Sequence, residues 1–176
     1  MRNKERYSLV KICEEFNDIF HLPGDTLTFT SASEHPIPTP KIDSMRGINT
    51  KPYRIPEIHR EGFQKQTDQM LLDGITVSSC SPWNSPILVI PKETDDSGTK
   101  WRILVDFRKL NDVAIGDSFP IPVISEILDA LGKSEYFSTV DCASGYLQVR
   151  VKLEYKAETA FSTREGQFQY RRMNFF

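Results

Sequence analysis

The chain has 176 residues, of which 39% are hydrophobic and 26% charged, and its formal net charge is −2. This composition excludes a disordered chain, a collagen-like repeat and a coiled coil, and the length suits one domain better than two. Because no apolar run could cross a bilayer and no charged-then-apolar leader opens the chain, we expect neither a membrane partner nor a secretion signal. Three scattered cysteines without metal-ligand spacing predict reduced thiols in an intracellular protein, in the cytoplasm or the nucleus: Cys13, Cys80 and Cys142.

The charges are unevenly distributed along the chain. Residues 148–176 contain six basic and three acidic residues, whereas residues 110–147 contain one basic residue, Lys133, and six acidic ones. Such a separation is compatible with an anion held beside a metal site, and equally with two ordinary solvated faces.

The N-terminal part divides into a helix and an extended stretch. Residues 5–20 carry apolar residues at helical spacing, and Pro23 and Gly24 then end the helix. Five prolines in residues 30–56 predict an extended strap lying over another part of the molecule, since proline fixes φ and lacks an N–H donor. We therefore divide the chain into a helical connecting segment (1–30), a proline-rich strap (31–56) and a main domain (57–176).

The first half of the main domain predicts a helix and a hairpin. Residues 57–73 form an amphipathic helix with Gly74 just beyond its end. Residues 87–90 and 101–107 are two strands joined by a polar turn at 94–98. In the second strand, alternation places Ile103, Val105 and Phe107 on one side and the following residues on the other: Arg102, Leu104 and Asp106.

The second half predicts a helix and further strands. Residues 122–131 form a helix ended by Gly132, and residues 136–141 a strand that runs into a tight connection at 143–145. Alternating apolar residues at 147–153 predict a half-buried strand, followed by a short polar turn or helix at 154–158. Residues 159–163 and 167–173 complete a last hairpin. The sum is an α+β fold with a mostly antiparallel sheet and packed helices.

Asp141 is the first candidate for catalysis. It ends an apolar strand and precedes small residues that leave room for a ligand, and carboxylate oxygen suits a hard cation such as Mg²⁺. The alternative is an aspartate that caps a turn. A single carboxylate does not make a two-metal site, because phosphoryl transfer between two ions needs at least one more.

A second group of candidates could hold a nucleotide. Arg102 and Lys100 flank the base of the hairpin and Lys92 lies on its other strand, so they could grip a triphosphate or form an ordinary solvated edge. Tyr146 follows Gly145 and could pack against a sugar, or simply enter the core.

Several ordered blocks resemble the reverse transcriptase of gypsy-type long-terminal-repeat retrotransposons. They are residues 81–86 (Ser-Pro-Trp-Asn-Ser-Pro), 101–111 (Trp-Arg-Ile-Leu-Val-Asp-Phe-Arg-Lys-Leu-Asn), 137–146 (Phe-Ser-Thr-Val-Asp-Cys-Ala-Ser-Gly-Tyr), 156–161 and 172–173. Residues 1–30 match no functional motif and look like the segment that joins protease to polymerase in such polyproteins.

The resemblance implies the fingers and the first part of the palm of a right-hand polymerase, incomplete in this chain. It implies that Asp141 and the carbonyl of Cys142 are ligands of one catalytic Mg²⁺, of two in the complete enzyme. It also implies that further residues contact the triphosphate or the sugar of an incoming dNTP or line its pocket: Lys92, Lys100, Arg102, Ser144, Gly145, Tyr146 and Phe175. The implied partners are an RNA or DNA template with its primer and the remainder of the Pol polyprotein.

Two departures from the family pattern bear on activity. The Tyr-x-Asp-Asp hairpin that supplies further carboxylates does not occur in these residues, and Met173-Asn174-Phe175-Phe176 stands where the family has Met-Pro-Phe-Gly. We therefore expect a truncated polymerase domain whose 176 residues alone are inactive. The competing hypotheses are a catalytically dead relic that only binds nucleotide or nucleic acid, and an unrelated α+β interaction module.

Overall fold

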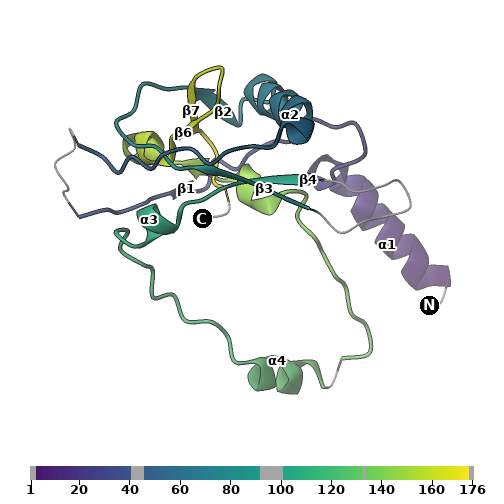
Figure 1. The fold of residues 1–176 in the computed structure, drawn as a ribbon. Coiled ribbons are helices and arrows are strands. Elements are labelled where there is room, and N and C mark those ends of the chain that lie inside the picture. The colour runs from purple at the N-terminus through teal and green to yellow at the C-terminus, as the bar shows by residue number, and fades with distance from the viewer. Residues whose placement is uncertain (1–2, 41–45, 92–100, 133, 175–176) are drawn as a thin grey trace.

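The computed structural model describes residues 3–40, 46–91, 101–132 and 134–174. They form short helices and three small sheets (Figure 1). The expected turn at 94–98 lies outside the described residues, as do Lys92, Lys100 and Phe175.

Most strand pairs are antiparallel, as expected. Strand β2 (Thr76–Ser78) pairs with β7 (Gln167–Tyr170), which also pairs with β6 (Phe161–Ser162). Strands β3 (Ile87–Pro91) and β4 (Trp101–Val105) form the predicted hairpin, with Ile87 opposite Val105. The β6–β7 hairpin predicted around residues 164–166 is also confirmed.

The helix predicted at 57–73 is confirmed as a 3₁₀ turn, η2 (Glu57–His59), that leads into α2 (Arg60–Leu72). Its buried face carries Phe63 and Thr67, and it lies beside β2. Gly74 follows with φ +63°, a left-handed conformation that glycine adopts without steric strain. A short helix, α3 (Arg108–Asn111), follows β4, and η4 (Leu153–Thr159) occupies the predicted polar turn or helix.

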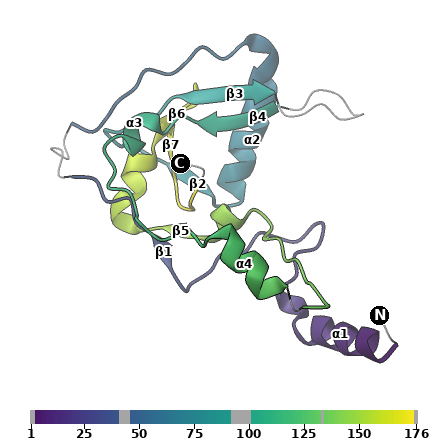
Figure 2. The ribbon, with the colours of Figure 1, turned by 90° about the horizontal axis from the view of Figure 1, so that it is seen from below.

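The described residues of the strap, 31–40 and 46–56, run extended across this assembly (Figure 2). The two-residue strand β1 (Glu34–His35) pairs in parallel with β5 (Arg150–Val151), and Ile37 enters the core. Further along, the backbones of Ile48 and Thr50 exchange hydrogen bonds with Asn84. Gly47 has φ +47°, and a Cβ there would lie 2.8 Å from the carbonyl carbon of Pro82, so only glycine allows this close crossing.

One apolar core joins these elements. It is built from α2, β3, β4, the start of α3, β5 and the β6–β7 hairpin, which lie side by side although they are far apart in the sequence. Its buried hydrophobic residues are Ile37, Phe63, Ile75, Trp83, Ile87, Val105, Phe107, Leu110, Val151, Ala160, Phe161, Phe168 and Tyr170. We call residues 46–91, 101–111 and 149–174 the body.

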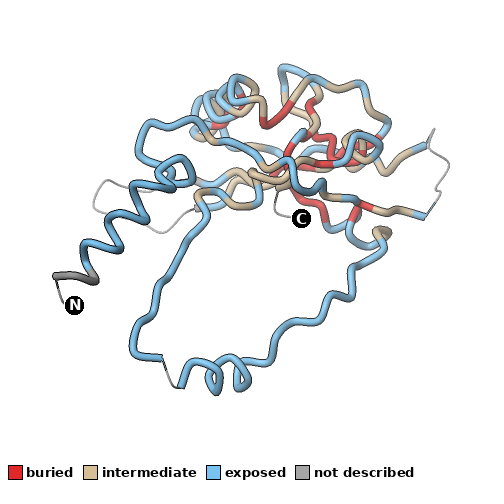
Figure 3. The backbone as a smooth tube through the Cα atoms, turned by 180° about the vertical axis from the view of Figure 1, so that it is seen from behind, coloured by how far each residue is buried: buried red, intermediate tan, exposed pale blue. Residues whose placement is uncertain are grey.

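Residues 116–142 leave the body as a long loop that carries α4 (Ile124–Leu131) (Figures 1 and 3). All its described residues are exposed, including the apolar face predicted for the helix. We call this segment the excursion. The helix prediction is confirmed, but the expectation of a packed helix is wrong for α4, since no other described element covers its apolar face.

The strand predicted at 136–141 is wrong. These residues have no regular structure and are exposed, and no described strand runs beside them. A β-strand depends on hydrogen bonds to a neighbouring strand, so its apolar pattern alone does not produce one.

Two other predictions are corrected. The strand predicted at 147–153 is limited to β5, because 3₁₀ turns flank it: η3 (Gly145–Gln148) before it and η4 after it. The N-terminal helix predicted at 5–20 is split into α1 (Asn3–Glu15) and η1 (Asn17–Ile19), and its apolar residues from Tyr7 onward are exposed.

Candidate nucleic-acid and nucleotide site

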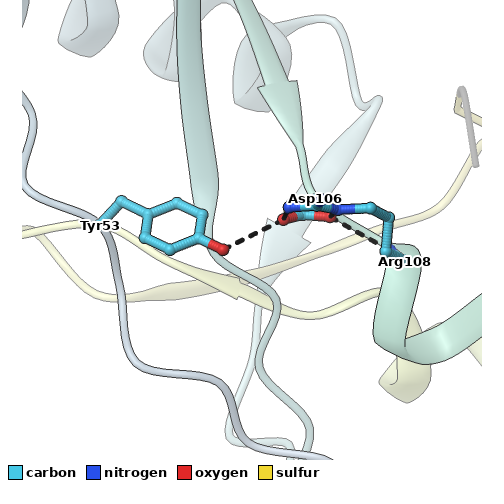
Figure 4. Close-up of polar contacts among 3 residues, drawn as sticks. All are labelled: Tyr53, Asp106 and Arg108. Carbon is cyan, nitrogen blue, oxygen red and sulfur yellow. Dashed lines mark hydrogen bonds and ion pairs between the residues drawn. The ribbon is translucent and has the colours of Figure 1, made fainter.

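Asp106 anchors a polar cluster at the end of β4 (Figure 4). Arg108 donates two hydrogen bonds to its carboxylate, from Nε to Oδ1 at 2.8 Å and from Nη2 to Oδ2 at 2.7 Å. The backbone N–H of Arg108 also donates to Oδ1 at 3.2 Å, and the Tyr53 hydroxyl donates to Oδ2 at 3.2 Å. The strap and the start of α3 thus meet at one carboxylate.

The cluster has a buried anion and an exposed cation. Asp106 is only 9% exposed, whereas the Arg108 side chain is 77% exposed. Hydrogen bonds from Arg108 lower the pKa of Asp106 to about 2, so the carboxylate is ionised at neutral pH. The fork geometry fixes the guanidinium while leaving part of it open to solvent.

A pocket of about 400 Å³ lies beside this fork. Its lining combines Asp106 and Tyr53 with the basic residues Arg108 and Lys109 and with further polar groups: Thr50, Asn111 and Asp112. Lys109 and Asn111 are exposed on α3. The lining thus balances two carboxylates, Asp106 and Asp112, with two exposed cations, Arg108 and Lys109. The exposed cations are the groups here that could contact a phosphate.

Asp141 and Cys142 lie at the end of the excursion and are exposed. In the described part of the chain, no group of three His, Cys, Asp or Glu side chains is arranged to hold a metal ion. The described residues therefore do not form a ligand set that would hold a resident Mg²⁺ by themselves.

The turn after Asp141 is tight. Ser144 has φ +48°, a left-handed conformation that is rare for residues other than glycine. A Cβ on Gly145 would lie 3.1 Å from Cβ of Cys142, so glycine eases the close return of the chain. Tyr146 follows in η3 with 49% of its surface exposed, and it therefore does not enter the core.

The structure does not bring Arg102 and Asp141 into direct contact. Arg102 is exposed on β4, opposite Ile90, and no hydrogen bond or ion pair between the described atoms joins it to Asp141. The roles assigned to Arg102, Asp141, Cys142 and residues 144–146 stay predictions. Lys92, Lys100 and Phe175 lie outside the described residues.

Sequence reasoning missed the Asp106 cluster as a site. The signal was an Asp-x-Arg sequence directly after an apolar strand, a spacing that lets the carboxylate bind the backbone N–H two residues on. The block at 81–86 serves the fold. The side chain of Asn84 donates to the carbonyl of Thr50 and accepts from Ser162, both at 2.7 Å, while Gln167 donates to the carbonyls of Ser81 and Trp83.

The chain is similar to several known proteins. The family described as "Reverse transcriptase (RNA-dependent DNA polymerase)" matches residues 90–175. The chain is 38% identical over 176 residues to the retrovirus-related Pol polyprotein from transposon 297, and 30% identical over 177 residues to that from transposon gypsy, both of Drosophila melanogaster. Each alignment covers 99% of this chain but only 16% of the length of the relative.

A solved structure of the foamy viral protease-reverse transcriptase in complex with RNA/DNA hybrid has the same fold over 99% of this chain and 22% of that one. The TM-score is 0.79 at 21% sequence identity. Helices that could span a membrane do not occur among the described residues.

Proposed function

Because the chain belongs to the reverse transcriptase domain of gypsy-type retrotransposon Pol polyproteins, we propose that it supplies the fingers and the first part of the palm of an RNA-directed DNA polymerase. In the complete enzyme a primer 3′-hydroxyl attacks the α-phosphate of a deoxynucleoside triphosphate and pyrophosphate leaves. The 176 residues span 16% of the Pol relatives, so this reaction belongs to the larger assembly.

The observation that carries the proposal is the Asp106–Arg108 fork, which lies within the matched residues 90–175. Asp106 holds the guanidinium in one orientation, and Lys109 adds a second exposed cation beside the same pocket. We assign this surface to the phosphate backbone of the template. Backbone contacts do not read sequence, as a polymerase that copies any template requires.

The loop at 143–148 is proposed to face the incoming nucleotide. Its tight turn presents Tyr146 on the surface, where the ring could pack against the sugar and exclude a 2′-hydroxyl. Arg102 would bind the triphosphate.

Asp141 is proposed as a metal-ligand side chain that these residues offer to the complete enzyme, with the carbonyl of Cys142 beside it. Mg²⁺ in such polymerases would supply charge stabilisation for the phosphoryl group. Since the described residues do not complete its coordination, primer extension by the 176-residue chain is expected to be undetectable. Extension that is lost in Asp141→Asn would contradict this expectation.

Binding of a fluorescent RNA/DNA primer–template hybrid, titrated over a range of salt concentrations, tests the template surface. Lys109→Gln removes one cation without touching Asp106, and Arg108→Gln removes the fork but keeps an amide donor for Asp106. Each substitution should weaken binding and reduce the slope of log K against log salt by about 1.

Lys65→Gln is the matched control for these variants. Lys65 is exposed on α2 and pairs with Glu61 at 2.7 Å, away from the pocket. Lys65→Gln removes the same charge as Lys109→Gln. Because Lys65 does not line the pocket, the salt slope of this variant should equal that of the parent chain. If all three variants bind alike, the template assignment fails.

A further inference from the structure

Residues 27–30 are held against the body by two arginines. Nη1 of Arg172 donates to the carbonyl oxygens of Leu27 at 3.0 Å and Thr28 at 3.4 Å. The guanidinium carbon of Arg150 lies 4.2 Å from the centroid of the Phe29 ring, and that of Arg172 lies 5.3 Å from it. Two cations therefore contact one aromatic ring.

Arg172 is buried where residues 27–30 contact the body. It is only 8% exposed, and Nη2 reaches the carbonyl oxygen of Asp73 at 3.4 Å. A buried cation needs hydrogen-bond acceptors to offset its lost hydration, and backbone carbonyls of residues 27 and 28 supply two of them. The N-terminal segment thus satisfies a charge that the body buries.

The same segment is hydrogen-bonded to the loop at 143–148. The backbone N–H of Thr30 donates to the carbonyl of Gln148 at 2.7 Å. The side chain of Gln148 in turn donates to the carbonyl of Ala143, also at 2.7 Å. Gln148 therefore connects residue 30 to the start of the turn that presents Tyr146.

Within the loop, two short hydrogen bonds keep its shape. Leu147 N–H donates to the carbonyl of Ser144 at 2.8 Å, and Val149 N–H to that of Tyr146 at 3.1 Å. On the far side, Met173 N–H donates to the carbonyl of Val149 at 2.7 Å. The loop is fixed to the body at its C-terminal end, while residues 27–30 contact it through Gln148.

We propose that residues 27–30 are a strut that positions the loop at 143–148, with Phe29 as its positioning residue. The inference rests on the proposed function in one respect, the assignment of this loop to the nucleotide side. It places the end of the N-terminal segment in the working unit of the polymerase, so that separating the polymerase after residue 30 would loosen its nucleotide site.

Backbone amide hydrogen exchange in the 176-residue chain tests the strut. Phe29→Ala should raise the exchange rates of the Leu147 and Val149 amides by about 3- to 10-fold. This is the factor expected from losing a partly desolvated cation–π contact. Amides of the β2–β7 pair should keep their rates. Phe29→Tyr retains the ring and should restore slow exchange.

Phe16→Ala is the matched control, because Phe16 is also an exposed aromatic residue of the N-terminal segment. It does not line the pocket that Phe29 shares with Gln148, and neither Arg150 nor Arg172 lies over its ring. Phe16→Ala should leave the loop amides unchanged. Unaltered loop exchange in Phe29→Ala, or an equal rise throughout the body, would overturn the strut.

Binding of dTTP separates this inference from the proposed function. If the parent chain binds dTTP, Phe29→Ala should weaken binding by about the same factor as the loop exchange rises, at an unchanged melting temperature. Unchanged affinity with a loosened loop would overturn the positioning role. If the parent chain does not bind dTTP while loop exchange responds as expected, the strut stands and the nucleotide assignment of the loop fails.

Discussion

In α2 of the body, Phe63 and Thr67 recur at helical spacing and are buried, whereas in α4 of the excursion Ile124, Ile127 and Leu128 recur at the same kind of spacing and are exposed. Both segments are helices. Helical periodicity therefore sets the local conformation in each, and the difference in burial comes from what lies beside them. The body places β2 against α2, while no other described element covers α4.

The strands of the two regions differ in the same way. β7 lies between β2 and β6 and forms hydrogen bonds on both edges, while residues 136–141 have a similar apolar content and form no strand. The body and the excursion thus carry similar sequence patterns but differ in whether another described element packs against them. We expect the free energy of unfolding to reside in the body and the excursion to contribute little to it.

The largest expected effect is in the body. Phe161 is 3% exposed, and its ring centroid lies 5.3 Å from that of Tyr170 and 5.9 Å from that of Phe168. Phe161→Ala should lower the free energy of unfolding by about 3–5 kcal/mol, through lost burial and the cavity left behind. Urea unfolding followed by tryptophan fluorescence measures it, and a loss below about 1 kcal/mol would show that this core is not where the stability resides.

A smaller effect is expected where the strap meets the body. Asp106→Asn weakens the hydrogen bonds to Arg108 and Tyr53 and should cost about 1–3 kcal/mol at pH 7. The pKa of Asp106 is lowered from 3.8 to about 2, so the unfolded state binds the proton more tightly. The stabilisation from the ionised group is therefore present above about pH 4 and is lost as the pH falls toward 2.

Unfolding experiments between pH 7 and pH 2 check the sign of this effect. The difference between the parent chain and Asp106→Asn should shrink as the pH falls through that range. A constant difference would mean that the charge on Asp106 does not contribute.

A gain in stability is expected at Glu158. Its Oε1 accepts a hydrogen bond from Thr39 at 2.9 Å, but Oε2 is buried and has no hydrogen-bond partner among the described residues. Burial raises the pKa of Glu158 above 4.5, so the folded state holds the proton more tightly and stability falls as the pH rises through the folded-state pKa.

Glu158→Gln removes the buried charge and should stabilise the chain by about 0.5–1 kcal/mol at pH 8, with little gain at pH 4. Glu154→Gln is the control, because Glu154 is exposed and pairs with Lys152 at 2.7 Å. A gain for both variants, or one independent of pH, would point to a general effect of lower negative charge.

The sequence allowed the elements of the body to be predicted because their local signals agree with their tertiary surroundings. Gly74 ends α2 and glycine-containing residues 164–166 turn the β6–β7 hairpin, as their positions predicted. The errors fall where a neighbour decides the outcome. Among the described residues, 136–141 have the composition of a strand but no partner edge, and α1 has an apolar face that no other element covers.

The candidate site was predictable only in part, for a related physical reason. Asp141 and Tyr146 stand out by their place in the sequence, and their roles stay predictions. The Asp106 fork could not be found from the alternation of side chains along the strand. Alternation assigns a side chain to one face of the strand, but it does not show which residue will donate hydrogen bonds to that side chain. Tyr53 lies more than fifty positions from Asp106 in the sequence, and only the crossing of the strap brings it within 3.2 Å.

The smallest expected effect is in the excursion, and it tests the comparison most directly. Leu128 lies in α4 and is 61% exposed, so Leu128→Ala removes an apolar side chain of similar kind to those of the core but leaves no cavity. The free energy of unfolding should change by less than about 0.5 kcal/mol, since alanine is also the better helix former. The amides of α4 should exchange nearly as fast as in an unfolded peptide, because an eight-residue helix without tertiary contacts is marginal in water. If instead Leu128→Ala costs as much as Phe161→Ala, the α4 face is covered in the 176-residue chain and the division between body and excursion is wrong.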